Sequence, residues 1–243
     1  MSVNFLTRTA LAGALVVSLA GIGFGGPPSI AGFGNGDFKV NGTASILDGT
    51  LTLTTAGFNQ RGSAFNNAKQ DITVFTTQFI FQATGGTNPR ADGVAFVIEN
   101  DPAGTSALST LDGGSSLGYQ GISPSVALEL NTFNFGSPGI NVRTNGAVGT
   151  YFSTAPVVLG SGDPIQVMVS YDGTNMTVGL LDTVTSATFS KSFAVDIPGT
   201  VGSPFDWVGF TGSTGSLDSV QTISTFSYSP FWESFLFYYF FAS

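Results

Sequence analysis

Short turn signals recur along this chain, and their spacing limits the folds that it can adopt. Asn-Gly or Asp-Gly pairs stand at residues 41–42, 48–49, 112–113, 145–146 and 172–173. These pairs favour tight turns, because Gly, Asn and Asp tolerate the backbone conformations that such turns need. The runs between them are rich in Thr, Val, Ile and Phe, and several alternate apolar with polar residues. This spacing predicts an all-β sandwich or barrel.

Several runs predict individual strands. Residues 165–171 and 176–181 flank the turn that starts at Asp172, which predicts a hairpin. Residues 207–210 and 223–228 are expected to form the last pair of strands. Outside the N-terminal region, no stretch keeps a helical period for three turns. We expect one folded domain over residues 32–229, whose core includes Phe79, Phe81, Val94, Phe96, Leu128, Val167, Val169 and Phe210.

The composition excludes several classes of function. Seven Lys and Arg stand against fifteen Asp and Glu, for a net charge of −8, which disfavours nucleic acid binding. The chain has no Cys and no His, and so lacks thiol chemistry, disulfides, the commonest general base and the commonest transition-metal ligand. Only 9% of the residues are charged. The surface is therefore expected to be polar but mostly neutral, which suits a ligand rich in hydroxyl groups.

The two ends differ from the central part. Arg8 precedes an uncharged, apolar stretch up to Gly26, which predicts a signal peptide over residues 1–31 with cleavage after residues 18–20 or 29–31. A membrane anchor is the alternative, disfavoured by the Gly-rich exit and Pro27-Pro28. We therefore expect a secreted or cell-surface protein, and the absence of Cys fits an exported bacterial protein at least as well as a cytosolic one. The aromatic tail, residues 230–243, is a truncated anchor, an added edge strand or a reading-frame artefact; these alternatives stay open.

Two segments point to a ligand site. Residues 91–96 read ADGVAF, and residues 126–133 read VALELNTF. Because side chains alternate along a strand, Glu129 and Asn131 share one face of the second segment, whereas Leu128 and Leu130 share the other. In an all-β chain, two such elements are typical of a sugar-binding rim.

The two segments resemble the legume-type (L-type) lectin family, whose A-D-G-x-x-F and V-A-[VL]-E-x-D-T-[FY] strands build the sugar and metal sites. Further segments match in the same order between residues 33 and 229: residues 46–54, 62–65, 75–81, 207–215 and 222–228. The resemblance implies an all-β, concanavalin-like jelly-roll sandwich of two antiparallel sheets. It also implies a non-catalytic, carbohydrate-binding function.

The resemblance implies roles for particular residues. Asp92 would accept hydrogen bonds from sugar hydroxyls, and a cis peptide bond between Ala91 and Asp92 would aim it; the alternative is that Asp92 only serves an Asp-Gly turn. Tyr119 or Phe135 would supply an apolar platform for a sugar ring, although each suits the core equally. The remaining residues implied in carbohydrate binding are Gly114, Ser115, Asn134, Ser216 and Leu217.

The metal site departs from the family pattern. Glu129 is retained, but Asn131 stands at the position of a bridging Asp, and Ser137 replaces a His. The loop that carries a further Asp is deleted. Calcium takes six to eight oxygen ligands, often carboxylates. One carboxylate and one amide cannot hold two divalent ions, so we expect the transition-metal site to be lost. A weak calcium site remains as an expectation, built from Glu129, Asn131, Asn134 and the carbonyl of Phe133.

The same residues bear on two other classes of function. Glycoside hydrolases of this shape carry a second carboxylate on the strand of Glu129, where this chain has Asn134, so no acid and nucleophile pair can form and we expect no enzyme. A structural or adhesive cell-surface sandwich without sugar binding is the main alternative. The expected partners are glycans or glycoconjugates, and copies of the same chain through sheet faces or edges.

Overall fold

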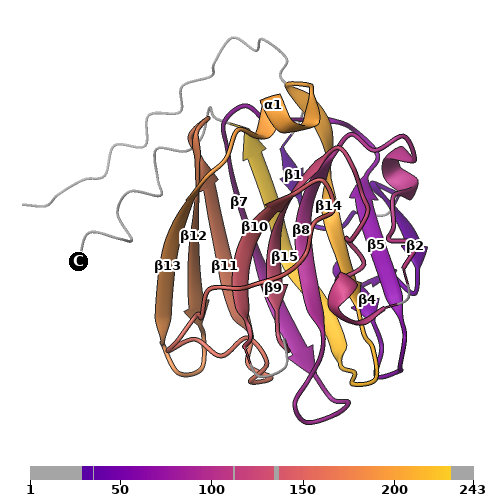
Figure 1. The fold of residues 1–243 in the computed structure, drawn as a ribbon, viewed down its shortest axis with the longest axis vertical. Coiled ribbons are helices and arrows are strands. Elements are labelled where there is room, and N and C mark those ends of the chain that lie inside the picture. The colour runs from indigo at the N-terminus through magenta and orange to yellow at the C-terminus, as the bar shows by residue number, and fades with distance from the viewer. Residues whose placement is uncertain (1–28, 35, 112, 134–136, 231–243) are drawn as a thin grey trace, which may run out of the picture.

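A computed structural model of the chain describes residues 29–34, 36–111, 113–133 and 137–230. Two antiparallel sheets pack face to face and their strands overlie one another in Figure 1, which confirms the predicted sandwich. Most of the proposed signal segment and nearly all of the aromatic tail lie outside the described residues, as do Asn134 and Phe135.

Every strand in these sheets pairs in the antiparallel sense. The eight-stranded sheet contains, in spatial order, β13 (Thr188–Ala194), β12 (Asn175–Asp182), β11 (Ile165–Tyr171), β7 (Phe75–Thr84), β15 (Val220–Pro230), β4 (Thr50–Thr54) and β3 (Ser45–Leu47), with β1 (Ile30–Ala31) beside β15. The seven-stranded sheet contains β10 (Gly139–Thr144), β9 (Ser125–Asn131), β8 (Gly93–Glu99), β14 (Phe205–Ser213), β5 (Arg61–Asn66) and β2 (Phe38–Gly42), with β6 (Gln70–Asp71) beside β14.

Helical segments are short. They are η1 (Gly104–Ser106), η2 (Gly114–Ser116) and α1 (Ile197–Val201). Within the part of the chain that the structure describes, no helix has the length and apolar character needed to cross a membrane.

The turn chemistry explains two of the hairpins. Asp48 and Gly49 both adopt positive φ, 49° and 72°, and join β3 to β4. Such a pair of positive φ values matches the right-handed twist of the flanking strands. Between β11 and β12, the carboxylate of Asp172 accepts hydrogen bonds from the backbone N–H groups of Thr174 and Asn175. The hairpin predicted at Asp172 is therefore confirmed.

The last two strands correct one expectation. β14 and β15 do not pair with each other, because β14 lies between β8 and β5 while β15 lies between β7 and β4. Both strands alternate apolar and polar residues, and each buries its apolar face in the same core from the opposite side. The chain therefore crosses from one sheet to the other after Ser213. The connecting loop lies at the lower end of the sandwich in Figure 1.

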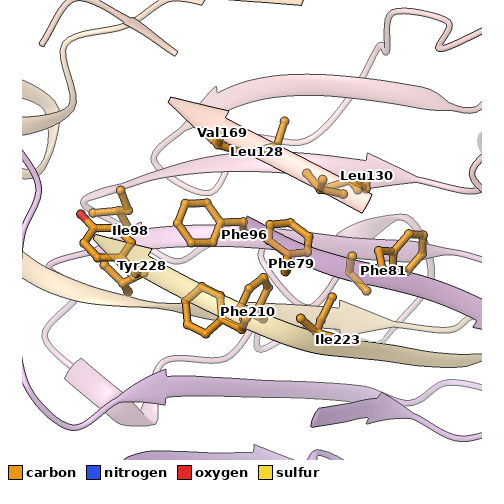
Figure 2. Packing of buried hydrophobic residues seen from close by; sticks show 14 of the residues in the cluster. Phe79, Phe81, Phe96, Ile98, Leu128, Leu130, Val169, Phe210, Ile223 and Tyr228 are labelled. Atoms are coloured by element: carbon orange, nitrogen blue, oxygen red, sulfur yellow. The ribbon is translucent and has the colours of Figure 1, made fainter. Parts of the chain in front are cut away.

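The core lies between the two sheets. All eight side chains predicted to be buried are at most 1% exposed. The ring of Phe210 lies 4.9 Å from that of Phe226, 5.0 Å from Phe79 and 5.5 Å from Phe96, measured between centroids. Figure 2 shows the Phe79, Phe96 and Phe210 rings gathered between the strands. This packing holds the sheet that contains β8 and β14 against the sheet that contains β7 and β15.

Candidate functional site

Asp92 stands directly before β8, at the end of the sandwich where β14 finishes. The peptide bond between Ala91 and Asp92 is cis, as the resemblance implies. The Asp92 N–H donates to the carbonyl of Ser213 at 3.1 Å, and the Asp92 carbonyl accepts from the N–H of Thr132 at 2.9 Å. The ends of β14 and β9 therefore hold its backbone from both sides.

The glycine that follows Asp92 is required by a close backbone approach. Gly93 has φ of +132°, and a Cβ placed on it would lie 2.2 Å from the carbonyl oxygen of Leu130. A side chain at this position would therefore push β8 away from β9. The Asp-Gly pair thus begins a strand in close contact with its neighbour.

Two buried polar side chains that the sequence analysis missed support this segment. The hydroxyl of Ser219 donates to the carbonyl of Ala91 at 3.0 Å, and Nε2 of Gln221 donates to the carbonyl of Ser213 at 2.8 Å. Both side chains are fully buried. A Gln at a core-facing position of an alternating strand is the signal that could have identified the second of them.

Two glycines bring backbone close to the Asp92 carboxylate. A Cβ on Gly215 would lie 3.3 Å from Oδ2 of Asp92 and 3.0 Å from Cα of Gly114, and a Cβ on Gly114 would lie 3.9 Å from the same oxygen. Hydrogen bonds keep the two loops together, because the Gly114 N–H donates to the Thr214 carbonyl at 2.8 Å and the Ser213 hydroxyl donates to the Gly114 carbonyl at 2.6 Å.

The remaining residues predicted to bind sugar lie beside these two glycines or outside the described chain. Ser115 and Ser216, each next to one of the two glycines, are exposed. Leu217 is half-buried, and its carbonyl accepts the Gly215 N–H at 3.1 Å. The structure therefore places Asp92, Gly114 and the Gly215 loop in one group. Asn134 lies outside the described residues.

The Asp92 carboxylate is an acceptor that the protein leaves open. The side chain is 7% exposed, and its Oδ2 atom has no hydrogen-bond donor within the described chain. Burial raises the pKa of Asp92 to about 6, and the backbone N–H of Gly215 lowers it in part. A buried acceptor without a hydrogen-bond donor destabilises the protein. A ligand hydroxyl that donates to this carboxylate would remove that cost and form a strong, charge-assisted hydrogen bond.

The predicted platform role of Tyr119 is wrong. Its side chain is fully buried. It packs in a hydrophobic cluster with Phe65 of β5 and with Leu117. Its hydroxyl bonds the Ser125 hydroxyl at 2.8 Å and accepts the Gly146 N–H at 3.0 Å. These contacts with distant segments bury the ring. Phe135, the other candidate, lies outside the described residues.

The two candidate metal residues on β9 are fully buried. Leu128 and Leu130 enter the core, and Glu129 and Asn131 occupy the opposite face, as predicted. Neither side chain makes a hydrogen bond of normal geometry among the described residues, but the Tyr151 hydroxyl lies close enough to interact with both. Burial raises the pKa of Glu129 to about 8, and the positive charge of Arg143 and the contact with Tyr151 lower it in part.

These residues do not fit a two-ion centre. Within the described chain, no group of three or more His, Cys, Asp or Glu residues gathers where it could hold a metal ion. Arg143 lies opposite Ala127 on β10 and adds positive charge on the face of Glu129, which opposes a divalent cation. Phe133 lies two residues after the end of β9, and Asn134 is not described.

A separate surface hollow lies far from this group. It has a volume of about 400 Å³, and its lining includes Ile30, Asp37 and Gln70. Gln70 pairs with Asp206 near the start of β14, whereas Asp92 contacts Ser213 at the end of the same strand. The hollow is therefore not part of the Asp92 group.

Comparison with known proteins gives a consistent result. The legume lectin domain matches residues 29–231. An L-type lectin-domain containing receptor kinase I.8 from Arabidopsis thaliana is 31% identical over 185 residues, which cover 63% of this chain and 27% of that relative. The chain thus spans about a quarter of the length of the curated relatives that it matches.

Solved structures share the fold. The lectin from Bauhinia forficata in complex with GalNAc matches with a TM-score of 0.67 and 23% identity, covering 83% of this chain and 97% of the other. Lectin I-B4 from Griffonia simplicifolia, in a metal-free form, matches with a TM-score of 0.67 and 21% identity, covering 83% and 98%.

Proposed function

The chain belongs to the legume lectin family, and from that premise we propose that it binds glycans at the Asp92 group. The function is carbohydrate binding without catalysis. One observation carries the placement of the site: the Asp92 carboxylate is buried, has no donor at Oδ2 among the described residues, and is approached by the backbone of Gly114 and Gly215.

The geometry suits adjacent sugar hydroxyls. The ionised carboxylate of Asp92 accepts from hydroxyl donors, and such charge-assisted hydrogen bonds are about twice as strong as neutral ones. Gly114 and Gly215 carry no side chain that would block a ring above the carboxylate. Ser115, Ser216 and Leu217 form the rim, where exposed hydroxyls add donors and acceptors. Because the Bauhinia forficata lectin is in complex with GalNAc, galactose-type sugars are the first candidates.

Binding at this site does not depend on a pair of divalent ions. Legume lectins usually bind calcium and manganese. In this chain the described donors are one carboxylate, Glu129, and one amide, Asn131, with the charge of Arg143 nearby. The alternative is a single, weakly bound calcium ion, held by Glu129, Asn131, Phe133 and Asn134. Removing calcium with a chelator distinguishes this alternative from metal-independent binding.

The chain is exported and acts outside the cell or at its surface. Ile30 is 7% exposed and pairs with Tyr228 of β15, which supports signal cleavage at residues 18–20 in preference to 29–31. N-terminal sequencing of the exported protein tests this, since a mature chain that begins after Ala31 would contradict it. Self-association through sheet faces or edges stays a prediction, and a light-scattering measurement of the molar mass in solution tests it.

A glycan array probed with the whole protein, once in calcium and once in EDTA, tests the proposed function. We expect a restricted set of glycans to bind in both buffers. Binding that requires calcium would contradict the metal-independent site and support the calcium alternative. No binding to any glycan in either buffer would contradict the lectin function and leave the structural or adhesive sandwich.

A further inference from the structure

Three consecutive carbonyl groups in the loop between β10 and β11 accept hydrogen bonds from half-buried side chains of other segments. Nη1 of Arg90 donates to the carbonyl of Gly160 at 2.9 Å and to that of Ser161 at 3.0 Å. Nε2 of Gln82, on β7, donates to the carbonyl of Gly162 at 2.8 Å. The segment before β8 and the opposite sheet therefore hold this turn of the loop together.

The guanidinium of Arg90 lies against the backbone of the turn. A Cβ on Gly162 would lie 3.3 Å from Cζ of Arg90, and Gly162 has φ of +98°. A side chain at this position would strain the backbone and crowd the guanidinium. The glycine thus allows the turn to approach Arg90 closely enough for one nitrogen to serve two carbonyls.

The same turn reaches the Asp92 segment by a second route. A Cβ on Gly160 would be in ordinary contact with Thr132, 3.6 Å from its carbonyl oxygen. The Thr132 N–H in turn donates to the Asp92 carbonyl at 2.9 Å. Arg90 stands two residues before Asp92 in the chain, so these contacts close a ring. The ring runs from Arg90 to Gly160, Thr132 and Asp92, and back through Ala91.

We propose that Arg90 is a positioning residue for the sugar site, because it clamps residues 160–162 to the start of β8 and so sets the position of the Asp92 carboxylate. This inference rests on the proposed function and extends it. Hydrogen bonds weaken steeply outside a narrow range of distance and angle. A small displacement of the carboxylate therefore lowers the affinity for a sugar hydroxyl. The clamp consists of protein groups alone and needs no metal ion.

The test measures the affinity for a glycan found on the array, together with the thermal midpoint of the same sample. Arg90→Met removes the donors and keeps most of the length of the side chain, and it should weaken binding about 5- to 30-fold. Arg90→Lys should keep binding within about threefold of wild type, because its single ammonium can donate to both carbonyls as Nη1 does.

A second variant acts on the turn from the other sheet. Gln82→Leu removes the donor to Gly162 and leaves Arg90 intact, so it should weaken binding in the same direction, by about two- to fivefold. This variant also tests the clamp if Arg90→Met does not fold. Wild-type affinity in Gln82→Leu, together with wild-type affinity or no folded protein in Arg90→Met, would overturn the inference.

Lys69→Met is the matched control for a general loss of stability. Lys69 is also a half-buried cation that joins distant segments, since its Nζ donates to Oδ1 of Asp206 at 2.7 Å and to Oδ1 of Asn100 at 3.3 Å. Asp206 is fully buried and lies near the start of β14, whereas Asp92 contacts Ser213 at its end. Lys69→Met should lower the thermal midpoint by more than about 4 °C and leave glycan binding unchanged.

The remaining outcomes separate this inference from the proposed function. If Lys69→Met weakens binding as much as Arg90→Met, or if Arg90→Lys restores none of the loss, the positioning role is wrong and the lectin function stands. If Arg90→Met binds as tightly as the wild type, the positioning role is again wrong. If the wild-type protein binds no glycan on the array, the proposed function fails, and this inference fails with it.

Discussion

Oδ2 of Asp92 lies 3.3 Å from the position that a Cβ on Gly215 would occupy. The same Cβ would lie 3.0 Å from Cα of Gly114, so a methyl group there would crowd both the carboxylate and the Gly114 backbone. The carboxylate and the glycine therefore pack closely, and any side chain on Gly215 would crowd Oδ2, an oxygen that is buried and lacks a donor among the described residues.

Gly215→Ala should weaken glycan binding at least about tenfold, because the added methyl group occupies the space over the carboxylate. The fold should survive, since Gly215 lies in the loop between β14 and β15 and is not part of a strand. Titration calorimetry and a thermal melt of the same sample give the two readouts. Binding that equals wild type, with an unchanged melt, would show that the ligand does not approach Asp92 past Gly215.

Binding should depend on pH through Asp92. Burial raises the pKa of this carboxyl to about 6, and only the ionised form accepts hydroxyl donors with full strength. Affinity should therefore be full above the pKa and fall as the pH drops through it, by about tenfold between pH 7 and pH 5. Calorimetry across this range measures the effect. The Asp92→Asn variant should show a flat profile, and a flat wild-type profile would contradict the assigned role.

Chelation should change stability little. The described residues around Glu129 do not provide the oxygens of a two-ion centre, so EDTA should leave the thermal midpoint nearly unchanged. A shift of more than about 4 °C, roughly 1 kcal/mol or more for a domain of this size, would show that calcium binds and stabilises the fold. Adding calcium back after dialysis provides the control, because a true ion effect must reverse.

Phe210 should contribute strongly to the free energy of unfolding. Its ring contacts those of Phe79, Phe96 and Phe226 between the sheets, and its side chain is fully buried. Phe210→Ala should cost about 3–5 kcal/mol, because the cavity cannot close fully. Phe205→Ala, at the exposed start of the same strand, should cost about 0.5 kcal/mol or less. Denaturant unfolding compares the two, and similar losses would contradict the described core.

The sequence predicts those parts of the fold that depend on local pattern. Strand alternation places Leu128 and Leu130 in the core, and the Asp-Gly turn at Asp172 identifies a hairpin, because both signals arise within a few residues. The ADG segment also identifies the position of Asp92, through its likeness to a known family.

The sequence does not predict features that depend on contacts between distant segments. The burial of Tyr119 follows from its bonds to Ser125 and Gly146, and no local pattern contains them. The hydrogen bond from the Ser219 hydroxyl to the Ala91 carbonyl joins residues that are 128 positions apart in the sequence. The loop before β5 likewise contacts the Gly215 loop across 157 positions of sequence, through the hydrogen bond from the Thr214 hydroxyl to the Gly57 carbonyl.

The most direct test of the central claim compares Asp92→Asn with wild type on the glycans found by the array. Losing a charged partner in a buried hydrogen bond costs about 1.5–3 kcal/mol, so affinity should fall about 10- to 150-fold while stability barely changes. Asp172→Asn is the control. Asp172 lies in the hairpin at the opposite end of β7 from the Asp92 loops, and an Asn can still accept its turn hydrogen bonds, so binding should stay at the wild-type level. If binding exists and Asp92→Asn leaves it unchanged, the sugar site is not at Asp92 and the account is wrong.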